Sequence, residues 1–347
     1  MNNFRQPNYS AWDFQIKDFF ACSSDEEKIA FLVKFAVLAP SSHNSQPWQF
    51  KLIQNKIFLK GDPSRELSKS DQRKRQEFIS IGAALENLLI AADYFGYKTA
   101  VEYLQNDIFE TTIEVTFEKI TEAKEDVNHL IHTILRRTTN RNNYDNKKDV
   151  DKMIISKIQN IPKFFSNISF DIINDSQKKS LLTETIVLAT KEAMRGRDFR
   201  RELAKYILPT KTHSSVGMPG DTIGVPFFFS YLLPLLIRIS PPPEKQSREL
   251  HSQLLLHTPF FGILSSTGDT TADWIDTGRT FGYITLTAEK HGLATHPLAA
   301  VIEMNDYRKI LMKEVTKNFL PQFFFRLGYP TKNSPHSPRL KNIEVIV

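Results

Sequence analysis

Two stretches govern the fold prediction: Gly82–Thr99, GAALENLLIAADYFGYKT, and Asp276–Thr295, DTGRTFGYITLTAEKHGLAT. Each begins with small and apolar residues on most faces of a helix, which is typical of a helix buried in a core. Each continues with an aromatic residue or a histidine, a glycine that can close a helix, and residues that favour a strand. This weak internal repeat predicts two diverged, fused copies of one α+β unit. Two unrelated core helices would look much alike, so the repeat alone leaves coincidence open.

Hydrophobic spacing predicts the other elements around these two helices. We expect helices over residues 25–38, 78–95, 127–135, 150–161, 176–194 and 273–291. We expect strands over residues 48–59 (a hairpin with its turn at 54–56), 98–103, 111–117, 168–173 and 257–265, and at the end of the chain, IEVIV, with a turn at 299–304. This order favours an α+β fold with mixed or antiparallel sheets around buried central helices.

The composition is that of a globular protein and argues against some classes of partner. The chain has 347 residues, 41% of them hydrophobic, which is enough for a substantial core in two domains or one large one. Its formal net charge is +6, without a block of five like charges or a basic stripe interleaved with aromatics, so no nucleic-acid binding is expected. A mildly positive balance suits an anionic ligand such as a phosphate.

A disulfide framework, a metal site and a membrane span are not expected. Cys22 is the one cysteine, and His251 and His257 do not have the spacing of a helical metal pair. The N-terminal residues lack the basic and apolar pattern of a secretory signal. The longest apolar run, residues 225–237, is too short to span a bilayer and contains Pro234. We therefore expect a cytoplasmic protein.

Residues 211–251 differ from the rest of the chain. They contain VGMPGDTIG, the apolar run VPFFFSYLLPLLI and ISPPPEKQSRELH, and show no helical periodicity. Long connections of this kind are binding loops, lids or linkers, and the apolar content argues against disorder. We interpret the segment as a lid or an inter-domain cover. Its apolar run is expected to be buried or to cap the core, with contact to a membrane or a partner as the alternative.

Two polar motifs have the residue types of an anion or cofactor site. Residues 39–48, APSSHNSQPW, follow a helix and offer hydroxyls, amides and backbone groups, with His43 as polar lining and Trp48 as a core anchor. Residues 136–144, RRTTNRNNY, place three arginines and two threonines close together before a predicted helix. Guanidinium groups fit phosphate oxygens, and hydroxyls add neutral donors. A solvated turn is the alternative for each motif.

Other enzyme classes find little support in the sequence. It has no GxGxxG after a strand, no GxxxxGK[ST], no HExxH and no GxSxG. The carboxylates of the central helices, Glu86 and Asp93 in one and Asp273 and Asp276 in the other, are expected to be solvated or capping rather than catalytic.

Taken together, these motifs resemble the nitroreductase family of FMN-dependent flavoproteins. APSSHNSQPW closely matches that family's PSxxNxQPW loop, and RRTTNR resembles its Arg-Arg-Ser-x-Arg start. AEKHGLATHPLAAV, residues 288–301, is similar to the family's helix end, Gly and Pro before the flavin. FFFRLGYP, residues 323–330, and the later SPRL are similar to its C-terminal LGYP and Arg. The RRxTNR form and the long inserted segment are similar to the Acg-like branch, known for a single-chain pseudo-dimer and a lid.

The resemblance implies two fused nitroreductase-like halves that keep one FMN site between them. The first half, residues 1–130, has the PSxxNxQPW loop but no Arg-rich start ahead of it. The second half, residues 131–347, has the arginines but no second loop, and residues 211–251 are its lid insertion. Because the family's dimer interface becomes internal, the chain is expected to be a monomer or a homodimer.

The resemblance also implies which residues bind FMN. Arg137 and Arg339 match phosphate contacts, and Arg141 matches a ring-edge contact. Ala299 and Ala300 stand where the family has a Glu-Gly pair whose backbone amide meets flavin N5. The expected cofactor-binding residues are Pro40, Ser41, Ser42, Asn44, Arg136, Arg137, Thr138, Thr139, Arg141, Ala299, Ala300 and Arg339, with Arg200 and Arg201 as further candidates.

The activity implied by the resemblance is that of an oxidoreductase. FMN accepts hydride from NAD(P)H and passes two electrons to a small aromatic acceptor, a nitroaromatic or a quinone. No catalytic side-chain acid or nucleophile is required, in agreement with the missing triad motifs. The alternative is a lidded FMN-binding or flavin-storage protein with little NAD(P)H turnover, because a lid over the flavin would exclude nicotinamide. A degenerate scaffold without flavin is the third hypothesis.

Overall fold

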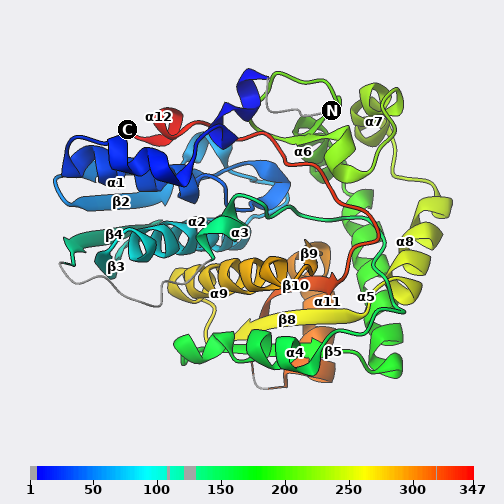
Figure 1. Ribbon diagram of the computed structural model, residues 1–347. Helices are drawn as coiled ribbons and strands as arrows, with labels where there is room; N and C mark the ends of the chain where they lie inside the picture. Colours follow the sequence, from blue (N-terminus) through cyan, green and yellow to red (C-terminus); the bar gives the residue numbers. More distant parts are fainter. Residues whose placement is uncertain (1–5, 108–109, 121–129, 318) are drawn as a thin grey trace.

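Two four-stranded antiparallel sheets and two central helices form the framework of the molecule (Figure 1). The computed structural model describes residues 6–107, 110–120, 130–317 and 319–347. The helix expected over residues 127–135 falls partly outside the described residues. Its described part contains a single helical turn, α3 (Ile131–Ile134).

The first sheet and helix α2 form one unit. The strands lie in the order β1-β2-β4-β3, and every neighbouring pair is antiparallel. Burial alternates along β4, so Ile113, Val115 and Phe117 turn to the core while their neighbours face outward. The elements of this unit are β1 (Trp48–Ile53), β2 (Lys56–Gly61), α2 (Arg75–Tyr94), β3 (Tyr97–Asp107) and β4 (Glu110–Lys119), preceded by α1 (Asp25–Ala36).

The second sheet and helix α9 form a similar unit. Its strands lie in the order β5-β8-β10-β9, again with every neighbouring pair antiparallel. Almost every residue of β10 is buried, because this strand lies inside the sheet and is covered on both faces. The elements of this unit are β5 (Ile168–Ile173), β8 (Phe260–Ser266), α9 (Thr271–Lys290), β9 (Ala294–Pro297) and β10 (Leu320–Gly328), preceded by α4 (Lys152–Gln159).

The two units share one topology. In each, the framework runs strand, strand, helix, strand, strand along the chain, and the sheet places them first, second, fourth, third. In each, the central helix ends before a glycine with positive φ, Gly96 at 78° and Gly292 at 74°, as the repeated sequence pattern predicts. The predicted α+β class, with antiparallel sheets around buried central helices, is confirmed.

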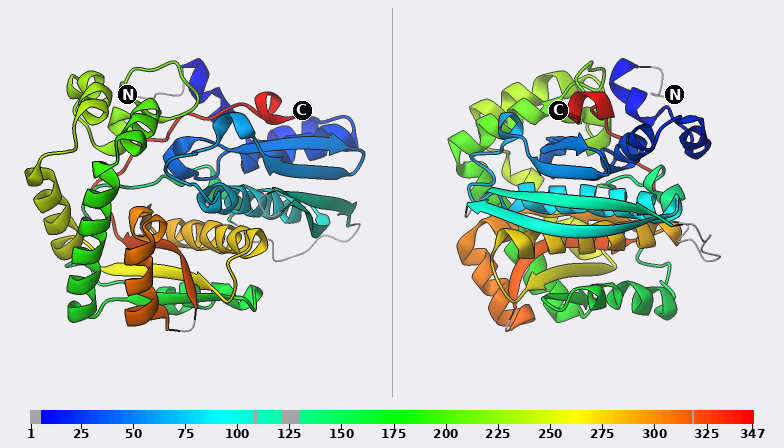
Figure 2. Two further views of the ribbon diagram at one scale, coloured as in Figure 1. Left: turned by 180° about the vertical axis from the view of Figure 1, so that it is seen from behind. Right: turned by 90° about the vertical axis from the view of Figure 1, so that its left-hand side faces the viewer.

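The central helices α2 and α9 lie against each other in the middle of the molecule, in both views of Figure 2 as in Figure 1. A Cβ on Gly82 would lie 2.1 Å from the carbonyl oxygen of Ile275. A Cβ on Gly278 would lie 2.0 Å from the carbonyl oxygen of Ile79. The glycines therefore permit a backbone-to-backbone contact that no other residue allows.

Polar side chains join the two units beside this contact, one between α2 and α9 and one between β3 and α9. Arg279 donates from Nε to Glu86 Oε2 at 3.0 Å, and Tyr103 donates from its hydroxyl to Asp276 Oδ1 at 2.7 Å. Glu86 is buried, so the expectation that it faces solvent is wrong. Its charge is compensated by Arg279 across the interface between the units. Asp273 does cap its helix, since its carboxylate accepts from the backbone and side chain of Thr270.

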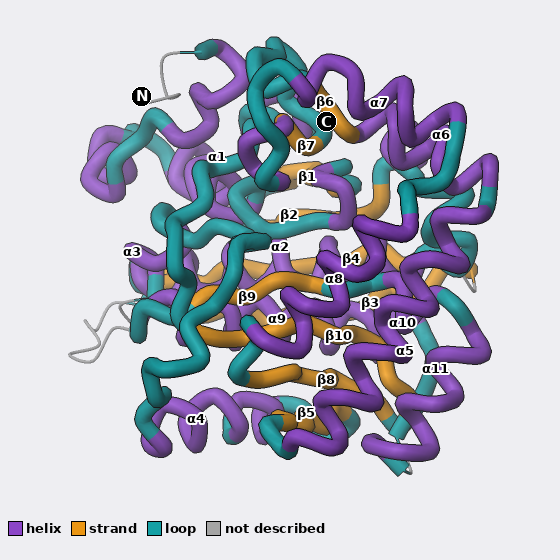
Figure 3. Tube along the Cα trace, turned by 90° about the vertical axis from the view of Figure 1, so that its right-hand side faces the viewer, coloured by secondary structure: helices purple, strands orange, loops and turns teal. Residues whose placement is uncertain are grey.

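The chain between β5 and β8 leaves the second unit and covers one side of the molecule with helices (Figure 3). They are α5 (Ser176–Arg195), α6 (Arg197–Tyr206), α7 (Phe229–Ile239) and α8 (Glu244–Leu256), with the short parallel pair β6 (Ile207–Leu208) and β7 (Met218–Pro219). The expectation that residues 211–251 lack helices is wrong. Glycines and prolines cluster between short helices there, so no single window shows a sustained helical period.

The C-terminal segment returns from β10 to the first unit, drawn in red in Figure 1. Leu340 donates its backbone N–H to Gln46 Oε1 at 2.8 Å, and Val347 donates to the carbonyl of Phe50 at 2.8 Å. The strand predicted for IEVIV is wrong. Residues 342–345 form a short helix, α12 (Asn342–Val345), because five apolar-rich residues fit one buried helical turn as well as a strand.

Between β9 and β10 the chain forms two short helices, α10 (Ala300–Glu303) and α11 (Asn305–Leu311), where the sequence predicts a turn at 299–304. Within the described residues, no helix combines the length and apolar content needed to cross a membrane.

Candidate functional site

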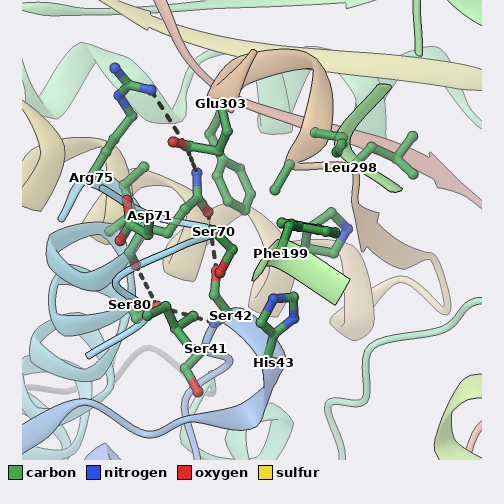
Figure 4. Close-up of a pocket in the computed structure, with 18 of the residues that line it drawn as sticks. Ser41, Ser42, His43, Ser70, Asp71, Arg75, Ser80, Phe199, Leu298 and Glu303 are labelled. Atoms are coloured by element: carbon green, nitrogen blue, oxygen red, sulfur yellow. Dashed lines mark hydrogen bonds and ion pairs between the residues drawn. The ribbon is translucent and has the colours of Figure 1, made fainter. Parts of the chain in front are cut away.

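A cavity of about 720 Å³ lies between the two units. Its walls come from the loop after α1, the start of α2, the Arg-rich motif, the α5–α6 junction and the region around α10. Cavities of roughly 300–1,000 Å³ are the usual size for small-molecule and cofactor sites. The cavity is therefore the candidate binding site, and Figure 4 shows part of its wall.

Seven of the twelve predicted cofactor-binding residues line this cavity. They are Pro40, Ser41, Ser42, Thr139, Arg141, Ala299 and Ala300. Residues more than two hundred positions apart in the sequence are thus brought to one wall. Of the remaining five, Arg136 is exposed and Thr138 is half-buried, and neither lines the cavity. Asn44, Arg137 and Arg339 are buried behind the wall.

The loop after α1 has an unusual backbone conformation. His43, Asn44 and Gln46 have positive φ values of 53°, 55° and 54°. This left-handed region is uncommon for residues other than glycine, and such residues persist where the surroundings fix them. The asparagine and glutamine side chains provide that fixation, because both are buried and hydrogen-bonded on two sides. The loop is a rigid shelf on the cavity wall.

Asn44 connects this shelf to the second unit. Its Nδ2 donates to the carbonyls of Gly217 at 2.9 Å and Pro338 at 3.0 Å, and its Oδ1 accepts from Arg339 Nη1 at 2.6 Å. Gln46 donates from Nε2 to the carbonyl of Ser215 at 2.6 Å. The side-chain oxygen and nitrogen of Asn44 are therefore engaged in hydrogen bonds that hold the loop, and Asn44 does not line the cavity.

Arg137 and Arg339 meet behind the shelf. Arg137 Nη2 donates to the carbonyl of Leu38 at 3.4 Å, and Arg339 Nη2 donates to the carbonyl of Ala39 at 3.2 Å. Arg137 also reaches Thr139 Oγ1 at 3.4 Å, and Thr139 lines the cavity. The two guanidinium groups, from the Arg-rich motif and the C-terminal segment, therefore lie beside consecutive carbonyls just before Pro40.

These two arginines form a buried concentration of positive charge. Burial lowers the pKa of Arg137 to about 10, and burial together with the charge of Arg137 lowers the pKa of Arg339 to about 9. His336 lies near both, and burial together with their charges lowers its pKa to about 4. Among the described residues no ion pair joins either guanidinium to a carboxylate, although Glu289 favours the charge of Arg137 through space. Arg339 Nε is buried without a partner.

Such an arrangement is costly unless an anion shares it. Two buried like charges whose hydrogen-bond partners in the described structure are neutral oxygens lose solvation without a compensating ion pair. A phosphate group would supply the missing negative charge and accept several charge-assisted hydrogen bonds. Thr139, which touches Arg137 and lines the cavity, connects this charge to the space where a ligand would lie.

Arg141, the third arginine of the Arg-rich motif, lines the cavity itself. Its Nη1 donates to the carbonyl of Thr222 at 3.1 Å, and its Nη2 lies 3.6 Å from the sulfur of Met218. Burial lowers its pKa to about 10, which leaves it charged at neutral pH. The helix expected after this motif is present as α4 (Lys152–Gln159), which begins after a turn at residues 146–148.

The start of α2 supplies a polar wall that sequence reasoning missed. Gln76 Nε2 donates to Glu303 Oε1 at 2.9 Å, and Arg75 Nη1 approaches the same oxygen at 3.4 Å. Ser42 Oγ lies 3.3 Å from Gln76 Oε1, which closes a chain of contacts from the shelf through α2 to α10 (Figure 4). The signal that was missed is the polar stretch DQRKRQE, residues 71–77, which covers the start of α2 and has the composition of a solvated turn.

Asp71 lies on this wall and is almost completely buried. Its Oδ2 accepts from the backbone N–H of Glu77 at 2.8 Å and so caps α2, while its Oδ1 has no partner. Burial, and then the charge of Glu303, raises the pKa of Asp71 to about 8. A neutral carboxyl group can donate as well as accept a hydrogen bond at the edge of the cavity.

The remaining wall is apolar. Ile79, Ala83, Phe281 and Phe323 lie on the α2 and α9 side of the cavity, and Phe199 of α6 lies on another. Polar groups on one side and apolar surface on the other suit a ligand with a charged tail and a flat aromatic body.

The segment between β5 and β8 contributes to the wall differently from the prediction. Of residues 211–251 the cavity is lined by Met218, whereas α5 contributes Thr190, Glu192 and Ala193. The apolar run at 225–237 is largely exposed, so the expectation that it is buried or packs over the cavity is wrong. Its prolines and adjacent glycines place it on a projecting helix instead.

Arg200 and Arg201 do not contact the cavity. Arg200 is buried and donates to the carbonyls of Met194, Arg195 and Ile237, so it fixes the junction of α5, α6 and α7. Arg201 is exposed on the opposite side of α6. Neither supports the expected ligand contact.

Comparison with known proteins gives relatives over most of the chain, although no family model matches. The chain is 26% identical over 304 residues to the uncharacterized protein Rv3127 of Mycobacterium tuberculosis, covering 85% of each. It is 24% identical over 307 residues to the putative NAD(P)H nitroreductase acg of the same organism, covering 85% of this chain and 87% of that protein. It is 31% identical over 77 residues, 22% of each, to the putative NAD(P)H nitroreductase Rv3131.

Solved nitroreductase structures also align with part of the chain. The FMN-dependent nitroreductase NfnB from Mycobacterium smegmatis, in complex with NADPH, aligns at a TM-score of 0.42 and 14% identity, covering 62% of this chain and 96% of that one. A nitroreductase with bound FMN from Bacteroides fragilis aligns at a TM-score of 0.38 and 16% identity, covering 60% of this chain and 91% of that one.

The paired α+β units and the cavity between them define a nitroreductase-like protein. The relatives that span most of the chain support the resemblance recognised from its motifs: the chain is similar to an Acg-like member of the nitroreductase family.

Proposed function

We propose that the chain is an FMN-dependent oxidoreductase of the nitroreductase type, located in the cytoplasm. The observation that carries the proposal is the buried pair Arg137 and Arg339, which lies behind the wall of a cavity lined by both halves and has no carboxylate ion-pair partner among the described residues. The relatives named as putative NAD(P)H nitroreductases support the same activity.

The residues present fit FMN. Its phosphate suits the positive charge of Arg137 and Arg339, where Arg339 Nε is an unpartnered buried donor. Its ribityl chain suits the hydroxyls of Ser41 and Thr139 on the cavity wall, and its flat ring suits the apolar side formed by α2 and α9. Arg141 lies where a positive charge would stabilise the ring edge, and Ala299 and Ala300 offer backbone contacts.

Bound FMN would supply the redox chemistry, a two-electron hydride transfer from NAD(P)H to a nitroaromatic or quinone-like acceptor. The side chains of the pocket would bind the FMN and hold it in one orientation. The rigid shelf, residues 40–46, fixes one face of the pocket through Asn44 and Gln46. The buried apolar part of the wall, which includes Ile79, Ala83 and Phe281, would keep water from that side of the pocket. Asp71, neutral below about pH 8, holds a proton at the cavity edge.

We further propose that the chain is a fused pseudo-dimer of two diverged nitroreductase-like halves, residues 1–130 and 131–347, with one FMN site. The identical strand order in both sheets and the contact of α2 with α9 support two copies of one unit. The insertion in the second half is the whole stretch from α5 to α8, wider than the proposed lid at 211–251. With its interface internal, the chain can act as a monomer or pair as a homodimer.

A second candidate function is FMN binding with little NAD(P)H turnover. The observation that favours it is the cover that α5 and α6 place over the cavity through Thr190, Glu192, Ala193 and Phe199. If this cover stays closed over the flavin, nicotinamide cannot stack on the ring. The two candidates share the cofactor and differ in access to it.

Anaerobic mixing of the FMN-loaded protein with NADPH, and separately with NADH, distinguishes the two. Loss of the flavin absorbance within seconds is expected for the oxidoreductase. Protein that stays oxidised with both nucleotides, yet is bleached by dithionite, would exclude NAD(P)H oxidation and favour the second function. Protein that never takes up FMN would exclude both.

A further inference from the structure

Helix α7 presents an unusual concentration of exposed apolar side chains. Eight of the nineteen large exposed hydrophobic side chains in the described part of the chain lie between residues 227 and 239. They are Phe227, Phe228, Phe229, Tyr231, Leu232, Leu235, Leu236 and Ile239. A contiguous apolar surface of this kind marks an interaction site rather than ordinary surface. We call these eight side chains the α7 patch.

The α7 patch is held in place from its inner face. Near the start of the helix, the buried Ser230 Oγ accepts from the backbone N–H of Thr210 at 3.0 Å and donates to the carbonyl of Phe227 at 2.6 Å. Near its end, Arg200 Nε donates to the carbonyl of Ile237 at 3.1 Å. Both ends of α7 are fixed, so the outward direction of the patch is a property of the fold.

Positive charge surrounds the α7 patch. Residues 195–239 contain seven Lys and Arg against three Asp and Glu. Their net charge of +4 is most of the chain's net charge of +6. Arg238 lies on α7 itself, Arg201 and Lys205 are exposed on the neighbouring α6, and Lys211 Nζ lies 5.8 Å from the Phe227 ring centroid.

The carboxylates nearby are mostly engaged. Glu202 is buried and accepts from the backbone N–H groups of residues 69 and 70, and Asp221 is half-buried. On α8, Glu244 pairs with Lys191 at 2.7 Å and Glu249 lies 3.8 Å from Lys245. Asp198, at the start of α6, is the exposed acidic residue of the stretch. The field around the patch is therefore positive.

We propose that the α7 patch docks the protein on an anionic lipid bilayer. The aromatic and aliphatic side chains would enter the boundary between headgroups and acyl chains, and the surrounding Lys and Arg would contact the anionic headgroups. Eleven helical residues span about 16 Å, roughly half of the hydrocarbon core, so α7 lies along the surface instead of crossing it. Pairing with a second copy would bring the positive rims of two patches together, which disfavours that occupant.

Vesicle co-sedimentation of the full chain tests the proposal independently of the flavin chemistry. Vesicles of equal parts phosphatidylglycerol and phosphatidylcholine are compared with pure phosphatidylcholine, at low and high salt. The wild type is expected to bind the anionic vesicles, and more weakly at high salt, because salt screens the headgroup attraction. Leu232→Gln combined with Leu235→Gln is expected to weaken binding about tenfold or more.

Two further variants distinguish a loss of membrane docking from a loss of folding. Ile343→Gln replaces another highly exposed apolar residue, in α12, and should bind vesicles like the wild type. Arg238→Glu keeps the apolar face and should lose the preference for anionic vesicles, even if the double variant proves unstable. Wild type that does not bind, or a double variant and Arg238→Glu that both bind like wild type, would overturn the proposal. So would a dimer that the double variant abolishes without any vesicle binding, since the occupant is then a second copy.

Discussion

Arg137 and Arg339 are the two residues proposed to bind a phosphate, and the structure places both beside the loop after α1. The motif that each belongs to is recognisable in the sequence, and both were predicted as phosphate contacts. Their shared surroundings were not predictable, because the carbonyls of Leu38 and Ala39 come from another part of the chain. Asp71 was missed for the opposite reason. Its neighbours are charged, and only tertiary packing buries it.

The role of Arg137 can be separated from its contribution to stability. Its hydrogen bonds are long, at 3.4 Å, and it repels Arg339. Arg137→Ala should therefore weaken FMN binding about tenfold to a hundredfold, the effect of a lost charge-assisted hydrogen bond. The melting temperature of the flavin-free protein should stay equal or rise. Fluorescence-quenching titration and thermal melts measure the two effects.

The matched control for this variant is Arg248→Ala, which removes an exposed arginine of α8. It should leave FMN affinity unchanged. Equal loss of affinity in both variants would contradict the phosphate assignment.

Asp71 should make stability depend on pH. Its pKa is about 8 in the folded protein and near 3.8 when exposed, so between these values the folded state holds a proton that the unfolded chain has lost. The free energy of unfolding therefore falls as pH rises through this window, by about 1.4 kcal/mol per pH unit for one proton. Glu77, whose pKa burial raises to about 7, adds a slope of the same sign.

Asp71→Asn keeps the cap on α2 and removes this titration. Denaturant unfolding at pH 5, 6, 7 and 8 should show a shallower fall for the variant, which should be the more stable protein at pH 8. A variant whose stability parallels that of the wild type at every pH would show that Asp71 is ionised in the fold.

At the scale of elements, the long central helices were predictable and the short ones were not. Twenty residues of helical periodicity ending at a glycine give a strong signal, as in α2 and α9. The last five residues are too few to show such a periodicity. The short helix α12 forms there and buries the side chain of Val345. In residues 211–251 the glycines before α7, Pro234 within it and the prolines at 241–243 between α7 and α8 concealed both helices.

The contact between α2 and α9 gives a prediction for two glycines of one helix. Gly278→Ala would place a Cβ 2.0 Å from the carbonyl oxygen of Ile79, so the helices must separate, at a cost of about 2–3 kcal/mol. Gly282→Ala is the matched control. Its nearest obstacle is Glu86 Cβ at 3.3 Å, and the gain in helix propensity offsets that contact to within about 1 kcal/mol. Chemical denaturation of both variants measures the difference, and equal stabilities would contradict the close crossing.

At the scale of the whole molecule, the repeated pattern in the sequence predicts two similar units, and the structure gives both the same strand order. The order of the motifs along the chain also predicts how the halves divide the site. The shelf comes from the first half, the arginines come from the second, and the C-terminal segment returns to join them. The proposed insertion is wider than the lid predicted at 211–251, because α5 and α6 look in sequence like ordinary continuations of the second unit.

The division of the site between unlike halves makes the number of flavins per chain the decisive quantity. The purified full-length chain is titrated with FMN, and the bound flavin is counted by absorbance against protein concentration. One FMN per chain is the predicted result, since the shelf and the pair Arg137 and Arg339 each occur once in the described structure. Saturation at two FMN per chain, or no binding at all, would contradict a single site shared between the halves.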